Sequence, residues 1–247
     1  MPDETKVIAV IGGKGGVGKT TVAAGLALAL SERFRVGLLD CDLSGPSVPT
    51  LLGVQGPPEV RDGRMVPPVA EVDDRRVAVM STGLFGDAET TFGWHGPVLR
   101  GVLRQFARDV LWESLDYLVL DTPPGSGELH AAVLAAFEPR AAVAVTTADP
   151  LAVADTRRSL RWFRDLLPVV AVVHNRAGAV CGSCGAADAV DETALADLAP
   201  GVPRFGVPAV VGGQQPWTSP LAAARLADLA RHVARPTTSV SRSQAAS

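Results

Sequence analysis

The chain lacks the features that mark several specialised classes of protein. Only three of its 247 residues are cysteines, which rules out a disulfide framework and favours a reduced, cytoplasmic protein. The formal net charge of −3 provides no basic field of the kind that dedicated nucleic-acid binders carry. The longest apolar run, Val22 to Leu30, is too short to cross a bilayer, and the N-terminus has no signal-peptide layout. We therefore expect no nucleic-acid partner and no stable membrane association.

Lysine is also scarce, and its positions are informative. The 23 basic residues comprise 20 arginines and three lysines. Two of the lysines, Lys14 and Lys19, lie in one glycine-rich loop. A lysine differs most from an arginine where a compact, flexible ammonium is needed instead of a planar fork. This loop is therefore the first candidate for a functional site.

Apolar runs rich in β-branched residues alternate with helical segments along the chain. This alternation predicts βαβ units and a doubly wound, mostly parallel α/β sheet with helices on both faces. The expected strands are Val7–Ile11, Val36–Leu39, Tyr117–Leu120, Ala141–Val145, Val169–Val173 and a weaker, proline-containing Val202–Val207. The expected helices are Thr20–Leu30, Pro97–Asp109, Gly127–Phe137, Leu151–Leu166, Glu192–Leu198 and Leu221–Val233.

We expect one domain over residues 1–234, because no segment is interpreted as a domain boundary. Gln55 to Arg76 is rich in proline, glycine and charge, and we expect a surface insertion there, with a hairpin as one form. Residues 235–247 are rich in serine and threonine without an apolar period, which predicts a disordered tail.

The glycine-rich loop matches the phosphate-binding pattern G-x-x-x-x-G-K-[ST] between an expected strand and an expected helix. Its glycines let backbone N–H groups surround phosphate oxygens, and the helix N-terminus adds positive partial charge. Lys19 is expected to reach the β- and γ-phosphates, and the Thr20 hydroxyl to ligate Mg²⁺. The expected nucleotide-binding residues are Gly13, Lys14, Gly15, Gly16, Val17, Gly18, Lys19, Thr20 and Thr21.

Carboxylates follow two of the expected strands. Asp40 and Asp42 are two residues apart, so an extended chain places both side chains on one side. We expect Cys41, between them in sequence, to be a small packed side chain. Asp121 ends the apolar strand that begins at Tyr117, as the second acidic group of a phosphate-loop NTPase does. At the carboxyl edge of a parallel sheet these groups would face the phosphates, where one holds magnesium or its water and another orients the attacking water.

Another expected strand ends near Asn175. A guanine-reading motif needs an aspartate three places after the asparagine, and that place holds Gly178. The sequence therefore favours adenine, whose edge an asparagine amide can pair with.

Two of the cysteines are spaced as a ligand pair. Cys181 and Cys184 form a C-x-x-C motif in a loop near residues 178–190, and they supply half of a four-ligand set. A symmetric dimer would complete the set with a second pair, which permits a bridging [4Fe–4S] cluster or a zinc ion. A redox dithiol, or no function, remains an alternative.

These motifs together resemble the Mrp/ApbC-type iron–sulfur cluster carrier ATPases, within the MinD/ParA class of deviant Walker A proteins. The resemblance is carried by Gly12–Thr21, Asp40–Pro49, Asp121–Gly127 and the cysteine pair. The family's glycine-rich stretch after the pair looks shortened and is replaced here by Ala186 to Ala199.

The resemblance implies roles for single residues. It places Lys14 on phosphate across a nucleotide-sandwich homodimer. It makes Asp40 and Asp121 magnesium-binding, Asp42 water-activating and Asn175 adenine-binding. It implies a [4Fe–4S] cluster on Cys181 and Cys184 that is passed to apo-proteins under ATP hydrolysis. Two alternatives remain open: a MinD/ParA-like regulatory or positioning ATPase, and an ATPase that inserts nickel or another metal.

Overall fold

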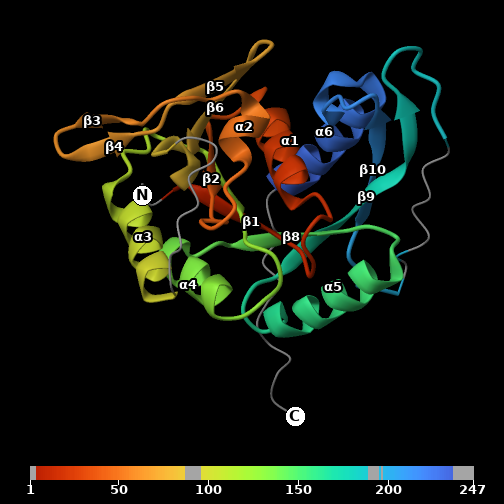
Figure 1. Ribbon diagram of the computed structural model, residues 1–247. Helices are drawn as coiled ribbons and strands as arrows, with labels where there is room; N and C mark the ends of the chain where they lie inside the picture. Colours follow the sequence, from red (N-terminus) through yellow and green to blue (C-terminus); the bar gives the residue numbers. More distant parts are fainter. Residues whose placement is uncertain (1–3, 87–95, 189–194, 196, 236–247) are drawn as a thin grey trace.

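In the computed structural model the chain forms a central eight-stranded sheet (Figure 1). The structure describes residues 4–86, 96–188, 195 and 197–235. The strand order is β10-β9-β8-β1-β7-β2-β6-β5, and all neighbours are parallel except β5 and β6. The strands are β1 Lys6–Ile11, β2 Val36–Asp40, β5 Val69–Val72, β6 Arg75–Met80, β7 Tyr117–Asp121, β8 Ala141–Thr146, β9 Val169–Cys181 and β10 Arg204–Val211.

Helices cover both faces of the sheet, as predicted. The helices are α1 Lys19–Ser31, α2 Val48–Leu52, α3 Gly96–Asp109, α4 Glu128–Phe137, α5 Pro150–Phe163 and α6 Pro220–Ala234, with short 3-10 turns η1 Thr82–Leu84 and η2 Pro216–Thr218. Ile8 and Val10 pack with α1 and α6, whereas Val7 packs with α3 and α4 and Ala9 with α5. Alternate residues of one strand thus serve opposite layers, which explains the continuous apolar runs in the sequence.

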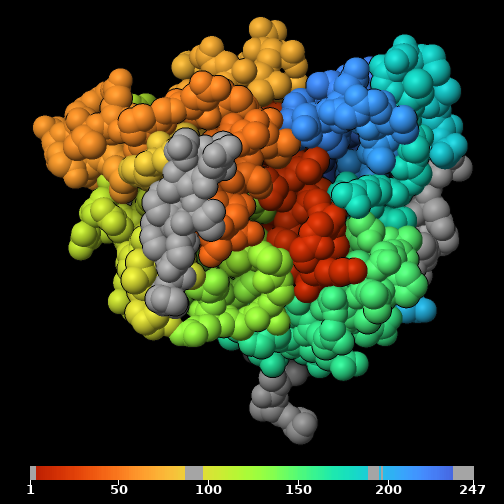
Figure 2. Space-filling view, viewed as in Figure 1, coloured from red at the N-terminus to blue at the C-terminus, as the bar shows by residue number. Residues whose placement is uncertain are grey.

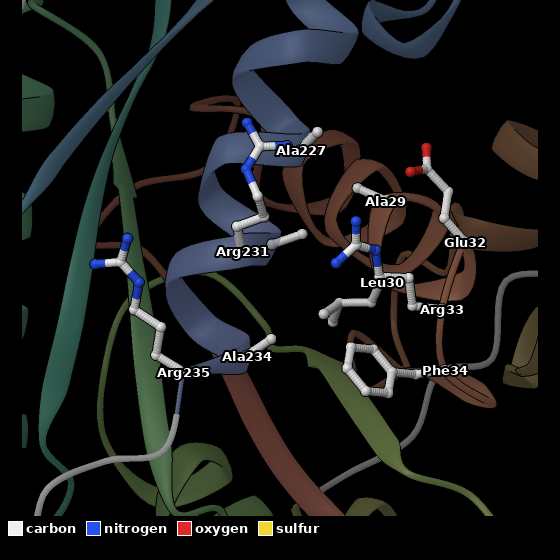
Figure 3. Close-up of a pocket in the computed structure, with 10 residues that line it drawn as sticks. Ala29, Leu30, Glu32, Arg33, Phe34, Ala227, Arg231, Ala234 and Arg235 are labelled. Atoms are coloured by element: carbon white, nitrogen blue, oxygen red, sulfur yellow. The ribbon is translucent and has the colours of Figure 1, made fainter.

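Helix α1 packs closely against α6 on one face. A Cβ on Gly25 would lie 2.6 Å from Leu226 Cδ1, so a glycine permits the close approach. A groove of about 290 Å³ opens between the C-terminal end of α1 and α6, where Leu30, Phe34 and Ala234 meet (Figure 3). This groove is at the opposite end of α1 from the phosphate loop. No helix in the described part of the chain is both long and apolar enough to traverse a lipid bilayer.

The structure corrects several expected elements. The segment Gln55 to Arg76 contains the expected hairpin, formed by β3 Glu59–Arg61 and β4 Arg64–Val66, but β5 and the start of β6 belong to the main sheet. The strand expected to end at Val173 continues to Cys181. Of the helix expected at Glu192–Leu198, only Leu195, Asp197 and Leu198 lie among the described residues, and they form turns. The expected tail, apart from Arg235, lies outside the described residues.

Candidate nucleotide and metal sites

The phosphate loop joins β1 to α1 at the carboxyl edge of the sheet. Gly16 and Gly18 have φ values of 79° and 91°, a backbone conformation that residues with a β-carbon rarely adopt. A Cβ on Gly13 would lie 2.2 Å from the Asp155 carbonyl carbon, so the loop lies directly against α5. Figure 2 shows this red segment at the surface, bordered by the orange residues near 45 and the green residues near 125 and 155. The loop therefore has the predicted context and an open face.

Lys19 is buried at the start of α1. Burial lowers the pKa of its ammonium, and the charges of Asp121 and Asp42 oppose that effect. The predicted lysine and two of the predicted carboxylates are therefore close enough to interact. A buried cation among carboxylates is suited to exchange these partners for the oxygens of a phosphate.

Asp40 is buried and fully hydrogen-bonded. Its carboxylate accepts hydrogen bonds from the backbone N–H groups of Asp42 (3.1 Å), Ser47 (3.0 Å) and Val48 (3.2 Å) and from the Ser81 hydroxyl (3.1 Å). Burial nevertheless raises its pKa to about 6. The Ser47 hydroxyl in turn lies 3.4 Å from Thr20 Oγ1. Asp40 thus shapes the segment that faces Thr20, and its magnesium role remains a prediction.

Asp121 is the opposite case. It is 1% exposed, and neither carboxylate oxygen has a well-aligned hydrogen-bond partner among the described residues. Burial, and then the charge of the register neighbour Asp40, raises the pKa of Asp121 to about 8. Thr20 and Lys19 lie close enough to oppose this rise. Two orphaned oxygens beside a threonine hydroxyl fit a hard, oxygen-seeking cation such as Mg²⁺.

Replacing Asp121 by asparagine is expected to raise the melting temperature of the protein at pH 8 without nucleotide or magnesium. The pKa of Asp121 is about 8 in the folded protein against 3.8 for an unperturbed aspartate, so the folded protein holds a proton that unfolding releases. Stability from this group is complete below about pH 4 and is lost as the pH rises through about 8. The gain of Asp121→Asn over the parent should therefore grow across this range in thermal scans.

Asp116→Asn is the matched control for that scan. Hydrogen bonds from Arg35 lower the pKa of Asp116, so its stabilising effect is present at high pH and is lost on acidification. This variant should lose a little stability at pH 8 instead of gaining it. An Asp121→Asn protein that melts no higher than the parent at pH 8 would contradict the raised pKa.

Asp42 and Lys14 lie nearer the open face. Burial raises the pKa of Asp42 and the charge of Lys19 opposes this, and the side chain keeps partial exposure. Lys14 Nζ lies 3.6 Å from Asp149 Oδ1, and both side chains are about half exposed. Asp149 also accepts a hydrogen bond from Ala152 N and so caps α5. Lys14 is thus held at the surface, and its role on phosphate across a dimer remains a prediction.

Asn175 is brought to the phosphate loop. Its Nδ2 donates to the Val17 carbonyl at 2.8 Å, in a buried contact. The predicted contact with adenine is not tested by this arrangement, which shows instead that the amide already has a partner in the loop.

The cysteine pair lies on a tight hairpin. Cys181 is the last residue of β9, and Gly185 N donates to its carbonyl at 2.9 Å while Cys181 N donates to Ala186 O at 2.8 Å. The backbone N–H groups of Cys184 and Ser183 lower the pKa of the Cys181 thiol, which favours the thiolate that metals bind. Cys184 is exposed, whereas Cys41 is buried and the pKa of its thiol is raised well above 9.0.

The hairpin supplies two thiolates and no more. Across the described residues, no group of three or more His, Cys, Asp or Glu side chains is arranged to hold a metal. A four-ligand site on this hairpin therefore needs ligands from elsewhere, as the sequence predicts.

Sequence reasoning missed some residues of the site. Ser81 comes from the end of β6, 41 residues from Asp40, and no local pattern marks it. His130 in α4 is buried against the rings of Trp162 and Phe163, and burial, followed by the charge of Lys19, lowers its pKa to about 4. The sequence marks His130 only by its place in the first turn of the helix that follows Gly127.

The chain is similar to known proteins in sequence and in fold. A family model described as ParA, NUBPL iron-transfer P-loop NTPase, matches residues 3–198. The human cytosolic Fe-S cluster assembly factor NUBP2 is 40% identical over 210 residues, covering 81% of this chain and 77% of that protein. The iron-sulfur cluster carrier protein of Pseudomonas fragi is 41% identical over 186 residues, covering 74% of this chain and 64% of that protein.

Solved structures show the same fold. A nucleotide-binding protein from Archaeoglobus fulgidus, in complex with ADP, matches with a TM-score of 0.67 and 29% identity, covering 94% of this chain and 89% of that one. The septum site-determining protein MinD of Pyrococcus horikoshii, with Mg-ADP, matches with a TM-score of 0.64 and 20% identity, covering 94% and 96%. The second likeness bears on the fold alone.

Proposed function

The chain belongs to the NUBPL iron-transfer family of P-loop NTPases, and from this membership we propose that it is an ATP-driven carrier of iron–sulfur clusters. In this proposal it binds and hydrolyses ATP, holds a [4Fe–4S] cluster between two copies of the chain and passes the cluster to apo-proteins in the cytoplasm. The relatives named as cluster carriers and cytosolic assembly factors support the cargo and the compartment.

The cysteine hairpin is the observation that carries the proposal. Two thiols, one with a lowered pKa, lie at a surface turn with no further ligand from the described part of their own chain. Two copies related by a two-fold axis would place four thiolates around one ion or cluster. The homodimer follows from this ligand count, and Lys14 at the open face is consistent with it.

The nucleotide site supplies the hydrolytic part of the proposal. Lys19 would bind the β- and γ-phosphates, and the loop N–H groups would surround them. Thr20 and Asp121 would hold Mg²⁺, with Asp40 acting through the Ser47 segment. When bound, Mg²⁺ neutralises charge that develops on the phosphates. Asp42, partly exposed beside Lys19, would orient the attacking water.

Purification without oxygen tests the cargo. Iron, acid-labile sulfide, zinc and nickel would be measured per chain, beside a Cys181→Ala/Cys184→Ala variant. We expect about two iron and two sulfide per chain, absent from the variant, as one four-iron cluster shared by two chains requires. If the parent instead contains zinc or nickel and the variant contains none, the two cysteines are metal ligands but the proposed iron–sulfur cluster is overturned. No metal in either protein after reconstitution would overturn the carrier and favour a regulatory ATPase.

A further inference from the structure

One strand connects the phosphate loop to the cysteine hairpin. β9 carries both Asn175 and Cys181, whose partners Val207 and Val211 are four residues apart on β10, which is about 13 Å along that strand. In Figure 1 β9 runs beside β10 and leads into the cyan hairpin at the upper right. Two sites that the proposed function must coordinate are therefore parts of one backbone element.

Asn175 fixes a peptide unit of the phosphate loop. Its amide donates to the Val17 carbonyl at 2.8 Å, across 158 residues of sequence. A Cβ on Gly18 would lie 2.1 Å from Asn175 Nδ2, so only glycine admits the amide here. In a trans peptide the carbonyl of Val17 and the N–H of Gly18 point in opposite directions. The contact that holds the carbonyl outward thus holds the Gly18 N–H towards the inside of the loop, where phosphate binds.

Beyond Asn175 the strand is irregular. Arg176 has φ 60° and Gly178 has φ 88°. Between the pairs Val207↔Asn175 and Ala209↔Ala179, β9 advances four residues while β10 advances two. This bulge lies between the phosphate-loop contact and Cys181, where regular pairing has resumed opposite Val211. A bulge concentrates bending at one place in a strand.

We infer that Asn175 is a positioning residue, which orients the Gly18 N–H towards phosphate and, through the β9 bulge, links nucleotide occupancy to the exposure of the cysteine pair. The link rests on the proposed function in one respect: it gives the carrier a route between hydrolysis and cargo. The role of Asn175 in orienting the phosphate loop does not depend on whether the cysteines bind a cluster. A nucleotide pulling on the Val17–Gly18 peptide would shift Asn175, and the bulge would turn that shift into a change at the hairpin.

Nucleotide selectivity separates this role from base recognition. Asn175→Asp keeps the side-chain size but sets a carboxylate oxygen against the Val17 carbonyl. Calorimetric affinities for ADP and for GDP would be measured, with Asn175→Ala as a second variant should the first not fold. We expect both nucleotides to lose about tenfold in affinity, by the same factor, as loss of a buried hydrogen bond predicts. A loss confined to ADP would assign Asn175 to adenine and overturn the inference.

Thiol reactivity tests the link to the hairpin. The alkylation rates of Cys181 and Cys184 would be followed by mass spectrometry in metal-free protein, with and without saturating ADP, at a concentration where sedimentation shows one oligomeric state throughout. We expect ADP to change the rates about fivefold in the parent, the lower end of typical coupling between sites. Buried Cys41 is the internal reference.

Two variants decide the outcome. In Asn175→Asp, saturated with ADP, the rate change should disappear. In Gly178→Ala, which alters the bulge but leaves the Val17 contact, ADP affinity should persist while the rate change shrinks. A full rate change in Asn175→Asp, or none in the parent, would overturn the link. Because the measurement uses metal-free protein, a failure of cluster binding would show in the iron assay and not here.

Discussion

Lys19→Ala is expected to abolish nucleotide hydrolysis, with a loss of at least about 10²–10³-fold in kcat. Lys19 is the buried cation at the start of α1, and the charges of Asp121 and Asp42 act on it. Removing it leaves these carboxylates without the cation that acts on them and leaves the β- and γ-phosphates without the cation that their own subunit's loop supplies. Release of phosphate from ATP measures the effect.

Lys6→Ala is the control that the composition provides, because Lys6 is the one remaining lysine outside the loop. Its ammonium lies 5.3 Å from the Tyr117 ring centroid, near the start of β1. This variant should hydrolyse ATP at the parent rate, and circular dichroism should show both variants folded. Folded Lys19→Ala with even a tenth of the parent rate would remove Lys19 from the phosphate site.

Asp42→Asn is expected to separate binding from hydrolysis. Asparagine keeps the size of the side chain and removes the negative charge that would orient the attacking water. We expect kcat to fall by about 10²–10³-fold while ATP affinity stays within about threefold of the parent. Single-turnover hydrolysis and equilibrium ATP binding, measured on the same preparation, give the two values.

Asp73→Asn serves as the comparison for that variant. Asp73 lies in the turn before β6, at φ 52°, a conformation that asparagine accepts, and it pairs with Arg75 at the surface. It should change neither value. Loss of ATP affinity in Asp42→Asn as large as the loss of kcat would instead make Asp42 a binding residue.

The central layers could be predicted because each buried strand carries its own signal. β1, β2, β7 and β8 are short apolar runs, and their ends fall where the sequence places them to within about a residue. The pattern of β6 is weaker, since Arg75 and Arg76 begin it, and its membership of the sheet depends on pairing with β2. The sequence predicts that β9 ends at Val173, because Asn175 and Gly178 are typical of turns. Pairing with β10 extends the strand beyond these two residues to Cys181.

The site follows the same division. The residue types of the phosphate loop and the strand-end carboxylates were visible in single motifs. No single motif shows how many hydrogen bonds each carboxylate accepts. Ser47 and Ser81 donate to Asp40 from separate segments of the chain, and neither oxygen of Asp121 has such a donor among the described residues. The partner of Asn175 was likewise hidden, since it lies 158 residues away.

The three cysteines differ in a way that bears on oxidative damage. Cys41 is buried in an apolar cluster, and burial raises the pKa of its thiol well above 9.0, whereas the pKa of the Cys181 thiol is lowered on a surface turn beside exposed Cys184. Peroxide attacks the accessible thiolate first. Peroxide would therefore oxidise the hairpin cysteines before it reaches Cys41, the neighbour of Asp40 and Asp42. In the proposed carrier, oxidation of the hairpin would remove cluster binding while leaving the nucleotide site intact, and reduction of the two thiols would restore the carrier.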